Sequence, residues 1–141
     1  MRRLVVFVIL ASLVGPSTVI ASNSRFVTSP IDGRWEWTWT RADLTRNHET
    51  PFNVKTLAGP EVAVFANGHY RGHNLRTGRI DAGRFSVKGY VVTFTPEIGP
   101  SVGGGTATMT FSIYRDRLTW KLAPGRRGWS ALTITPWTRS S

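Results

Sequence analysis

Three tryptophans occupy every second position of the segment GRWEWTWT, residues 33–40. Successive side chains of a β-strand point to opposite faces, so Trp35, Trp37 and Trp39 share one face and Glu36 lies on the other. A row of exposed indole rings would leave a large apolar patch, which soluble monomers rarely tolerate without a partner. The segment therefore predicts a strand whose aromatic face points inward, where the rings either fill a core or contact a ligand.

Two histidines raise the question of a metal site. His69 and His73 would lie on the same side of an extended strand. A tetrahedral site needs further ligands, for which His48, Glu49 and Asp81 are the available donors. The glycine just before His73 favours a turn. We therefore expect exposed loop histidines and no metal site.

Signatures of catalysis are sparse. The glycine-rich segment 99–105 is not followed by the Gly-Lys-Ser/Thr sequence with which nucleotide-binding loops coordinate phosphate and metal, so it is expected to be a flexible loop. The chain has no cysteine that could act as a nucleophile, and Glu36 alternates away from the tryptophan face. We expect a binding protein that uses no cofactor, and not an enzyme.

The first 21 residues have the features of a secretory signal peptide. Arg2 and Arg3 precede the apolar run 4–14, and residues 19–21 offer a small-residue cleavage site. We expect cleavage before Ser22 and a secreted or otherwise extracytoplasmic mature protein. Retention of this segment as a membrane anchor is the alternative.

The chain is strongly basic. It contains 18 Lys and Arg against 8 Asp and Glu, and removal of Arg2 and Arg3 with the signal leaves 16 basic residues and a net charge of +8. Four arginines between residues 71 and 84 lie near Tyr70 and Phe85 in the sequence, a mixture that suits stacking and phosphate contacts. Export argues against a nucleic-acid partner. An anionic component of the cell envelope matches the same charge, and a solvated surface is the simpler interpretation.

Turn signals divide the rest of the chain into short strands. Asn67-Gly68 favours a tight hairpin because both residues accept positive φ, and Lys88-Gly89 and Arg115-Asp116 separate two further pairs of strands. We expect strands at residues 61–66, 69–75, 84–87, 90–95, 106–114, 117–122 and 129–135. Together with the tryptophan strand they predict an all-β, up-and-down barrel of seven or eight strands, whose closure removes exposed edges.

One helix and one long loop interrupt this pattern. Thr40 is followed three positions later by an acidic residue, as in a helix N-terminal capping box, which predicts a short helix over residues 41–47. The segment from His48 to Pro60 has no period and is expected to be a loop. Residues 22–30 would be a flexible N-terminal segment and residues 31–139 a single barrel domain.

Several short pieces of the chain carry a resemblance to a known family. They are the tryptophan strand with its TRADL helix start, NGHY at 67–70, GRFSV at 83–87, RDRLTW at 115–120 and PWTR at 136–139. Together they resemble the lipocalin and calycin pattern, and more narrowly a group of small secreted, lipocalin-like actinobacterial proteins without a settled function. The chain is shorter than lipocalins proper and lacks their disulfide and their middle motif.

The resemblance implies roles for the aromatic residues. In such barrels the first-strand tryptophan closes the floor and a late arginine packs across it, which would make Trp35 and Arg139 the structural closure. The interior above that floor would be the ligand site, and we expect it to be lined by Trp37, Trp39, Phe111 and Trp120. An eight-stranded barrel can instead be filled by its own side chains.

These patterns leave two functions open. The first is a monomeric, secreted protein that binds a small apolar or aromatic ligand inside the barrel. The alternative is a cell-envelope interaction module with basic loops and a filled barrel.

Overall fold

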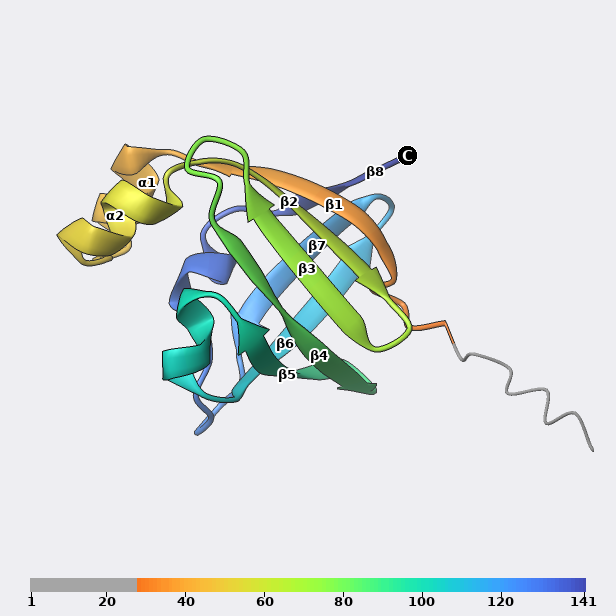
Figure 1. Ribbon diagram of the computed structural model, residues 1–141. Helices are drawn as coiled ribbons and strands as arrows, with labels where there is room; N and C mark the ends of the chain where they lie inside the picture. Colours follow the sequence, from red (N-terminus) through yellow and green to blue (C-terminus); the bar gives the residue numbers. More distant parts are fainter. Residues whose placement is uncertain (1–27) are drawn as a thin grey trace, which may run out of the picture.

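The computed structural model describes residues 28–141, so the expected signal peptide and residues 22–27 of the expected N-terminal segment lie outside the described residues. Eight antiparallel strands form a closed barrel in which each strand pairs with the next and β8 pairs back to β1 (Figure 1). The predicted all-β, up-and-down barrel is confirmed.

The strands alternate with a few short helical elements. The strands are β1 (Gly33–Trp39), β2 (Gly59–Ala66), β3 (His69–Asn74), β4 (Ile80–Lys88), β5 (Val91–Ile98), β6 (Ala107–Tyr114), β7 (Arg117–Leu122) and β8 (Trp137–Ser140). The helical elements are α1 (Arg41–Arg46), α2 (Pro51–Leu57) and the 3₁₀-helices η1 (Pro100–Gly104) and η2 (Ser130–Thr133). Within residues 28–141, no helix has the length and apolar character needed to cross a membrane.

The alternation in β1 has the predicted consequence. Trp35, Trp37 and Trp39 are buried, whereas Glu36 is exposed and pairs with Arg34 on the outer face. The tryptophan face of β1 therefore points into the barrel.

Two of the three predicted hairpin turns are present as expected, and the third lies one residue later, at Gly89-Tyr90, because Lys88 pairs with Val91. Asn67 and Gly68 both have positive φ, of 53° and 77°, as a tight two-residue turn between twisted strands requires. The flanking residues Ala66 and His69 pair directly across β2 and β3. Arg115 has a φ of 53° in the turn between β6 and β7. These turns fix the register that places the inward side chains.

The expected loop between residues 48 and 60 was wrong, because helix α2 lies within it. Thr50 caps this helix by accepting a hydrogen bond from the Asn53 backbone N–H at 3.2 Å, and Pro51 occupies the first helical turn. Proline is favourable there because its missing N–H would have no partner. The Thr-Pro pair was thus a helix start and not only a turn signal.

The last strand was also misplaced, and the glycine-rich segment is more regular than expected. Residues 130–133 form η2, with the consecutive residues Ala131 and Leu132 both buried, which a half-buried strand would not allow. The closing strand β8 is short, and Trp137 pairs with Leu118 while Arg139 pairs with Trp35. Within 99–105, the expected flexible loop, residues 100–104 form η1.

The two ends of the barrel differ. Figure 1 places α1, α2 and the teal and blue 3₁₀-helices toward one end, and the N-terminal residues of the described chain at the other. At that second end the guanidinium carbon of Arg139 lies 4.3 Å from the centre of the Trp35 ring. The Trp35 indole N–H donates to the Ile31 carbonyl at 2.8 Å, and Arg139 donates to the carbonyls of Pro30 and Asp32. This end is closed by packing and hydrogen bonds.

Candidate functional site

A cavity of about 330 Å³ lies at the helical end of the barrel interior. This volume is at the lower end of the range for pockets that bind small molecules. Residues of strands β1 to β5 and β8 form its walls, and residues of α2, η1, η2 and the neighbouring loops form its rim. The aromatic residues that line it are Trp37, Trp39, Phe65, Tyr70, Phe94, Trp129 and Trp137.

Trp37 and Trp39 both line this cavity, and their rings are held in place by other rings. Trp37 is stacked on Trp137 with ring centres 3.7 Å apart and an angle of 2° between the planes. Trp39 meets Trp37 edge-on at 5.4 Å. Because each ring is fixed by a neighbour, the aromatic wall is preformed.

The structure places Trp120 and Phe111 elsewhere. Both are buried, but neither is among the residues that line the cavity. Trp120 packs against Phe94 and Phe111, with ring centres 5.6 and 6.1 Å away. Of the four side chains expected at the ligand site, Trp37 and Trp39 line the cavity, whereas Trp120 and Phe111 fill the neighbouring interior. The barrel therefore has both a filled part and an open part.

The cavity also has a polar side that the sequence analysis missed. Glu61, Asn74 and Asp81 are the buried polar or charged residues among those described. Their positions follow from alternation: Glu61 shares its face of β2 with the inward residues Ala63 and Phe65. The same period-2 pattern that was applied to the tryptophans could have placed these side chains inside.

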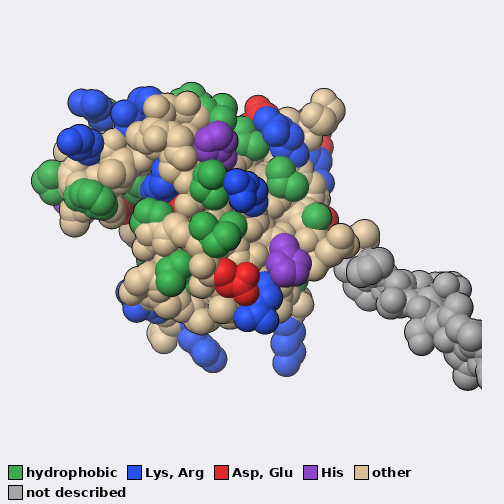
Figure 2. Space-filling view, viewed as in Figure 1, with side chains coloured by type: hydrophobic (Ala, Val, Ile, Leu, Met, Phe, Trp, Pro, Cys, Tyr) green, Lys and Arg blue, Asp and Glu red, His purple; other side chains and the backbone are tan. Residues whose placement is uncertain are grey.

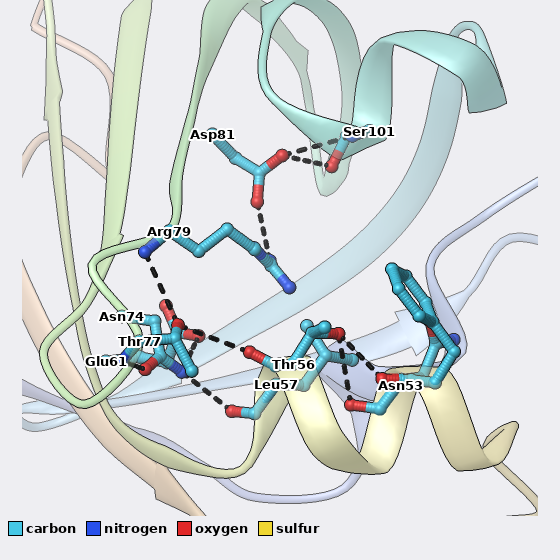
Figure 3. Close-up of polar contacts among 10 residues, drawn as sticks. Asn53, Thr56, Leu57, Glu61, Asn74, Thr77, Arg79, Asp81 and Ser101 are labelled. Carbon is cyan, nitrogen blue, oxygen red and sulfur yellow. Dashed lines mark hydrogen bonds and ion pairs between the residues drawn. The ribbon is translucent and has the colours of Figure 1, made fainter.

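Asn74 holds the Glu61 carboxylate in place (Figure 3). Its side-chain amide donates to Glu61 Oε1 and to the Leu57 carbonyl, both at 2.8 Å. Its oxygen accepts from the backbone N–H groups of Arg76 and Thr77 at 3.0 and 2.8 Å. Asn74 therefore links β2, the end of α2 and the turn after β3, and its orientation is fixed by these four contacts.

Burial raises the pKa of Glu61 from 4.5 to about 7. The hydrogen bond from Asn74 and the positive charge of Arg79 act in the opposite direction, and the negative charge of Asp81 adds to the increase. Removal from water dominates because an ionised carboxylate loses its hydration there. Glu61 can thus change its charge near neutral pH.

Asp81 is paired far more completely than Glu61. Its Oδ2 lies 2.5 Å from a guanidinium nitrogen of Arg79, and its Oδ1 accepts from the backbone N–H and the hydroxyl of Ser101 at 3.1 and 2.8 Å (Figure 3). These contacts fix η1 against the start of β4. The charge of Asp81 is compensated within the protein.

Ser101 lies in a motif that the expectations above did not use. Residues 99–103 have the spacing Gly-x-Ser-x-Gly, which surrounds the nucleophile in α/β-hydrolases. Here the serine lies in η1 and its hydroxyl donates to Asp81. None of the three histidines of the chain lines the cavity, so Ser101 has no imidazole base there to activate it. Its observed contacts are structural.

Tyr70 contributes a hydroxyl to the same interior. This oxygen is buried and has no hydrogen-bond partner within the described part of the chain. Burial, together with the negative charges of Asp81 and Glu97, raises the pKa of Tyr70 well above its ordinary value. The phenol therefore stays neutral at physiological pH, and its ring packs edge-on against Phe94 at 5.3 Å.

Glu49 ties the rim together. Its carboxylate accepts from the side-chain amide of Asn53 at 2.8 Å and from the hydroxyl of Ser130 at 2.7 Å. Asn53 belongs to α2 and Ser130 to η2, which are far apart in the sequence. The contact connects two sides of the rim, and all three residues line the cavity.

The two histidines considered as metal ligands lie elsewhere. His69 and His73 are exposed on β3, on the face opposite to the inward residues Tyr70 and Asn74. Across residues 28–141, no three His, Cys, Asp or Glu side chains come close enough together to hold a metal ion.

On the face drawn in Figure 2, the basic side chains of the described residues do not form one patch. Figure 2 shows Lys and Arg side chains at several places on the visible face, separated by hydrophobic and neutral surface. Arg76 donates to the Lys55 and Ala58 carbonyls, and Arg84 pairs with Glu97. With Arg79 paired to Asp81, three of the four arginines near Tyr70 already bind protein groups.

Comparisons with protein-family models, with curated proteins and with solved structures each found no match. The chemistry of the cavity therefore carries the functional argument. It combines a preformed aromatic wall, one incompletely paired carboxylate and one internal ion pair.

Proposed function

We propose that the chain is an exported, lipocalin-like binding protein that holds one small ligand with an aromatic or apolar body in the cavity at the helical end of the barrel. The observation that carries the proposal is the cavity of about 330 Å³ with its seven aromatic side chains, next to an interior that is otherwise filled. A closed barrel that needed only stability would gain by filling this space too.

The aromatic wall can supply useful affinity. A Kd of 1 mM corresponds to about 4 kcal/mol. Burial of about 300 Å² of apolar surface gives about 7.5 kcal/mol at about 25 cal/mol per Å². Binding also costs translational and conformational freedom. The stacking of Trp37 on Trp137 and the bridge from Glu49 to Ser130 keep the conformational part of that cost small because the wall and rim are already ordered.

Calorimetric titration of the mature protein with 3-ethylindole tests the proposal. This probe is neutral, flat and small, and we expect saturable one-to-one binding accompanied by a change in tryptophan fluorescence. Trp39→Ala should weaken the binding, whereas Phe111→Leu, which changes a buried ring outside the cavity wall, should leave it close to wild type. Absence of saturable binding by 3-ethylindole would refute the proposed function.

A further inference from the structure

We propose that the ligand of this cavity carries a protonated amine, which sits against the carboxylate of Glu61 while the aromatic side chains hold its apolar body. The inference rests on the proposed function and names the chemical class of the ligand. It is carried by the position of one buried, incompletely paired carboxylate in an aromatic cavity.

Glu61 is an acceptor without enough donors. It lines the cavity and is 3% exposed. Among the described residues, the hydrogen bond to its carboxylate comes from Asn74 and goes to Oε1, which leaves Oε2 available to a ligand. A buried carboxylate is unfavourable unless it is paired or hydrogen-bonded. A cationic donor in the cavity would supply the missing partner.

The other acidic groups of the cavity are already satisfied. Asp81 has the guanidinium of Arg79 and two donors from Ser101. Glu49 has donors from Asn53 and Ser130. Among the acidic groups of the cavity, Glu61 is therefore the one that a positively charged ligand group would stabilise most.

The surroundings of Glu61 also suit a cation. Glu61 pairs with Trp37 in the β1–β2 register, and both residues line the cavity. Cations are attracted to the faces of aromatic rings within about 6 Å, and tryptophan is the most favourable of them. An amine beside Glu61 would thus have a carboxylate and an indole wall within one small volume.

The charge of Glu61 predicts how binding depends on pH. The titratable or charged groups that share the cavity with it are Glu49, Tyr70, Arg79, Asp81 and Arg127, and Arg127 lies at the exposed rim. Glu61 has a pKa raised to about 7, so its ionised fraction increases between pH 6 and pH 8. A primary amine stays protonated over this range, so its affinity should increase about tenfold.

Three indoles test the inference by calorimetry on the mature protein at pH 6 and pH 8. Tryptamine carries the amine, tryptophol carries a neutral hydroxyl at the same position, and 3-ethylindole carries neither. At pH 8 we expect tryptamine to bind at least tenfold more tightly than both others, and to lose about that factor at pH 6. The affinity of 3-ethylindole should not change with pH.

Glu61→Gln supplies the matched test of the residue. The variant should reduce tryptamine affinity at least tenfold and abolish its pH dependence while 3-ethylindole affinity is retained. Glu36→Gln, an exposed carboxylate on the outer face, should change none of these values. The comparison of the three probes on wild-type protein decides the question even if Glu61→Gln does not fold.

The outcomes separate the two proposals. Equal affinities of tryptamine, tryptophol and 3-ethylindole would overturn the amine inference and leave the proposed function standing. Tighter binding of tryptophol than of tryptamine would overturn it in the same way. Failure of 3-ethylindole to bind at either pH would refute the proposed function itself.

Discussion

The two ends of this barrel use tryptophans of the same strand in different ways. At the closed end, Trp35 is fully buried, its N–H is hydrogen-bonded and Arg139 covers its face. At the helical end, Trp37 and Trp39 also point inward, but they form one wall of a cavity. Their indole N–H groups are buried without protein partners among the described residues.

The difference shows how one alternating strand can serve both stability and binding. The closed end joins β1 to β8 and is connected to the residues just before β1. The helical end is surrounded by short elements whose contacts come from distant parts of the chain. We infer that the closed end contributes more to stability than the helical end, which keeps an open volume and a buried acidic group.

The largest effect should come from the closed end. Trp35→Ala removes a fully buried ring together with its hydrogen bond and the cation–π contact, so it should reduce the free energy of unfolding by about 3–5 kcal/mol. Trp39→Ala should cost less, because one side of that ring faces the cavity and loses fewer packing contacts. Urea denaturation of both variants measures the two losses. Equal losses of unfolding free energy in the two variants would contradict the proposal that the closed end contributes more to stability than the helical end.

The next effect is a pH dependence that belongs to the helical end. The pKa of Glu61 is about 7 in the folded chain against an ordinary value of 4.5, so the unfolded chain releases this proton at lower pH. Stability due to Glu61 is therefore fully present below pH 4.5 and is lost as pH rises toward 7, by about 3 kcal/mol.

The difference in unfolding free energy between wild type and Glu61→Gln isolates this contribution. Between pH 5 and pH 8, the unfolding free energy of the wild type should fall relative to that of Glu61→Gln as pH increases. Glu36→Gln is the control, since its carboxylate is exposed on the outer face. A difference that stays constant over this range would show that Glu61 is not the group that titrates.

The smallest effect concerns the arginine at the floor. Arg139→Ala should reduce the unfolding free energy by about 1–2 kcal/mol, through loss of the cation–π contact and of packing by its aliphatic stem. The affinity for 3-ethylindole should not change. Arg34→Ala, which removes an exposed ion pair with Glu36, should cost clearly less. Arg139→Ala with full stability would contradict the assignment of the closed end.

Most of the barrel could be predicted from the sequence, because the signals for strands and hairpin turns lie within short segments of the chain. The alternation in GRWEWTWT gives the inward face of β1, and Asn67-Gly68 gives the hairpin between β2 and β3. Helix α2 was missed although Thr50-Pro51 signals its start, since the segment has no apolar period. The final strand β8 has only four residues, too few for alternation to identify it.

The candidate site was harder to predict, because alternation gives the face of a residue and not its height in the barrel. Phe111 and Trp120 point inward as expected, yet they lie outside the cavity wall because height depends on strand stagger. The same alternation could have placed Glu61 on the inward face of β2. The bridge from Glu49 to Ser130 joins residues 81 positions apart and leaves no local signal.

The most direct test of the central claim is to fill the cavity without disturbing the barrel. Gly72 lines the cavity, and a Cβ built on it would meet its nearest neighbour, the Asp81 carbonyl oxygen, at 3.6 Å, an ordinary contact. Gly103 lies outside the lining, and a Cβ there would meet nothing within 4 Å. We predict that Gly72→Leu folds and loses at least tenfold in 3-ethylindole affinity by calorimetry, while Gly103→Leu binds as the wild type does. Unchanged binding by folded Gly72→Leu would contradict the claim that the ligand occupies this cavity.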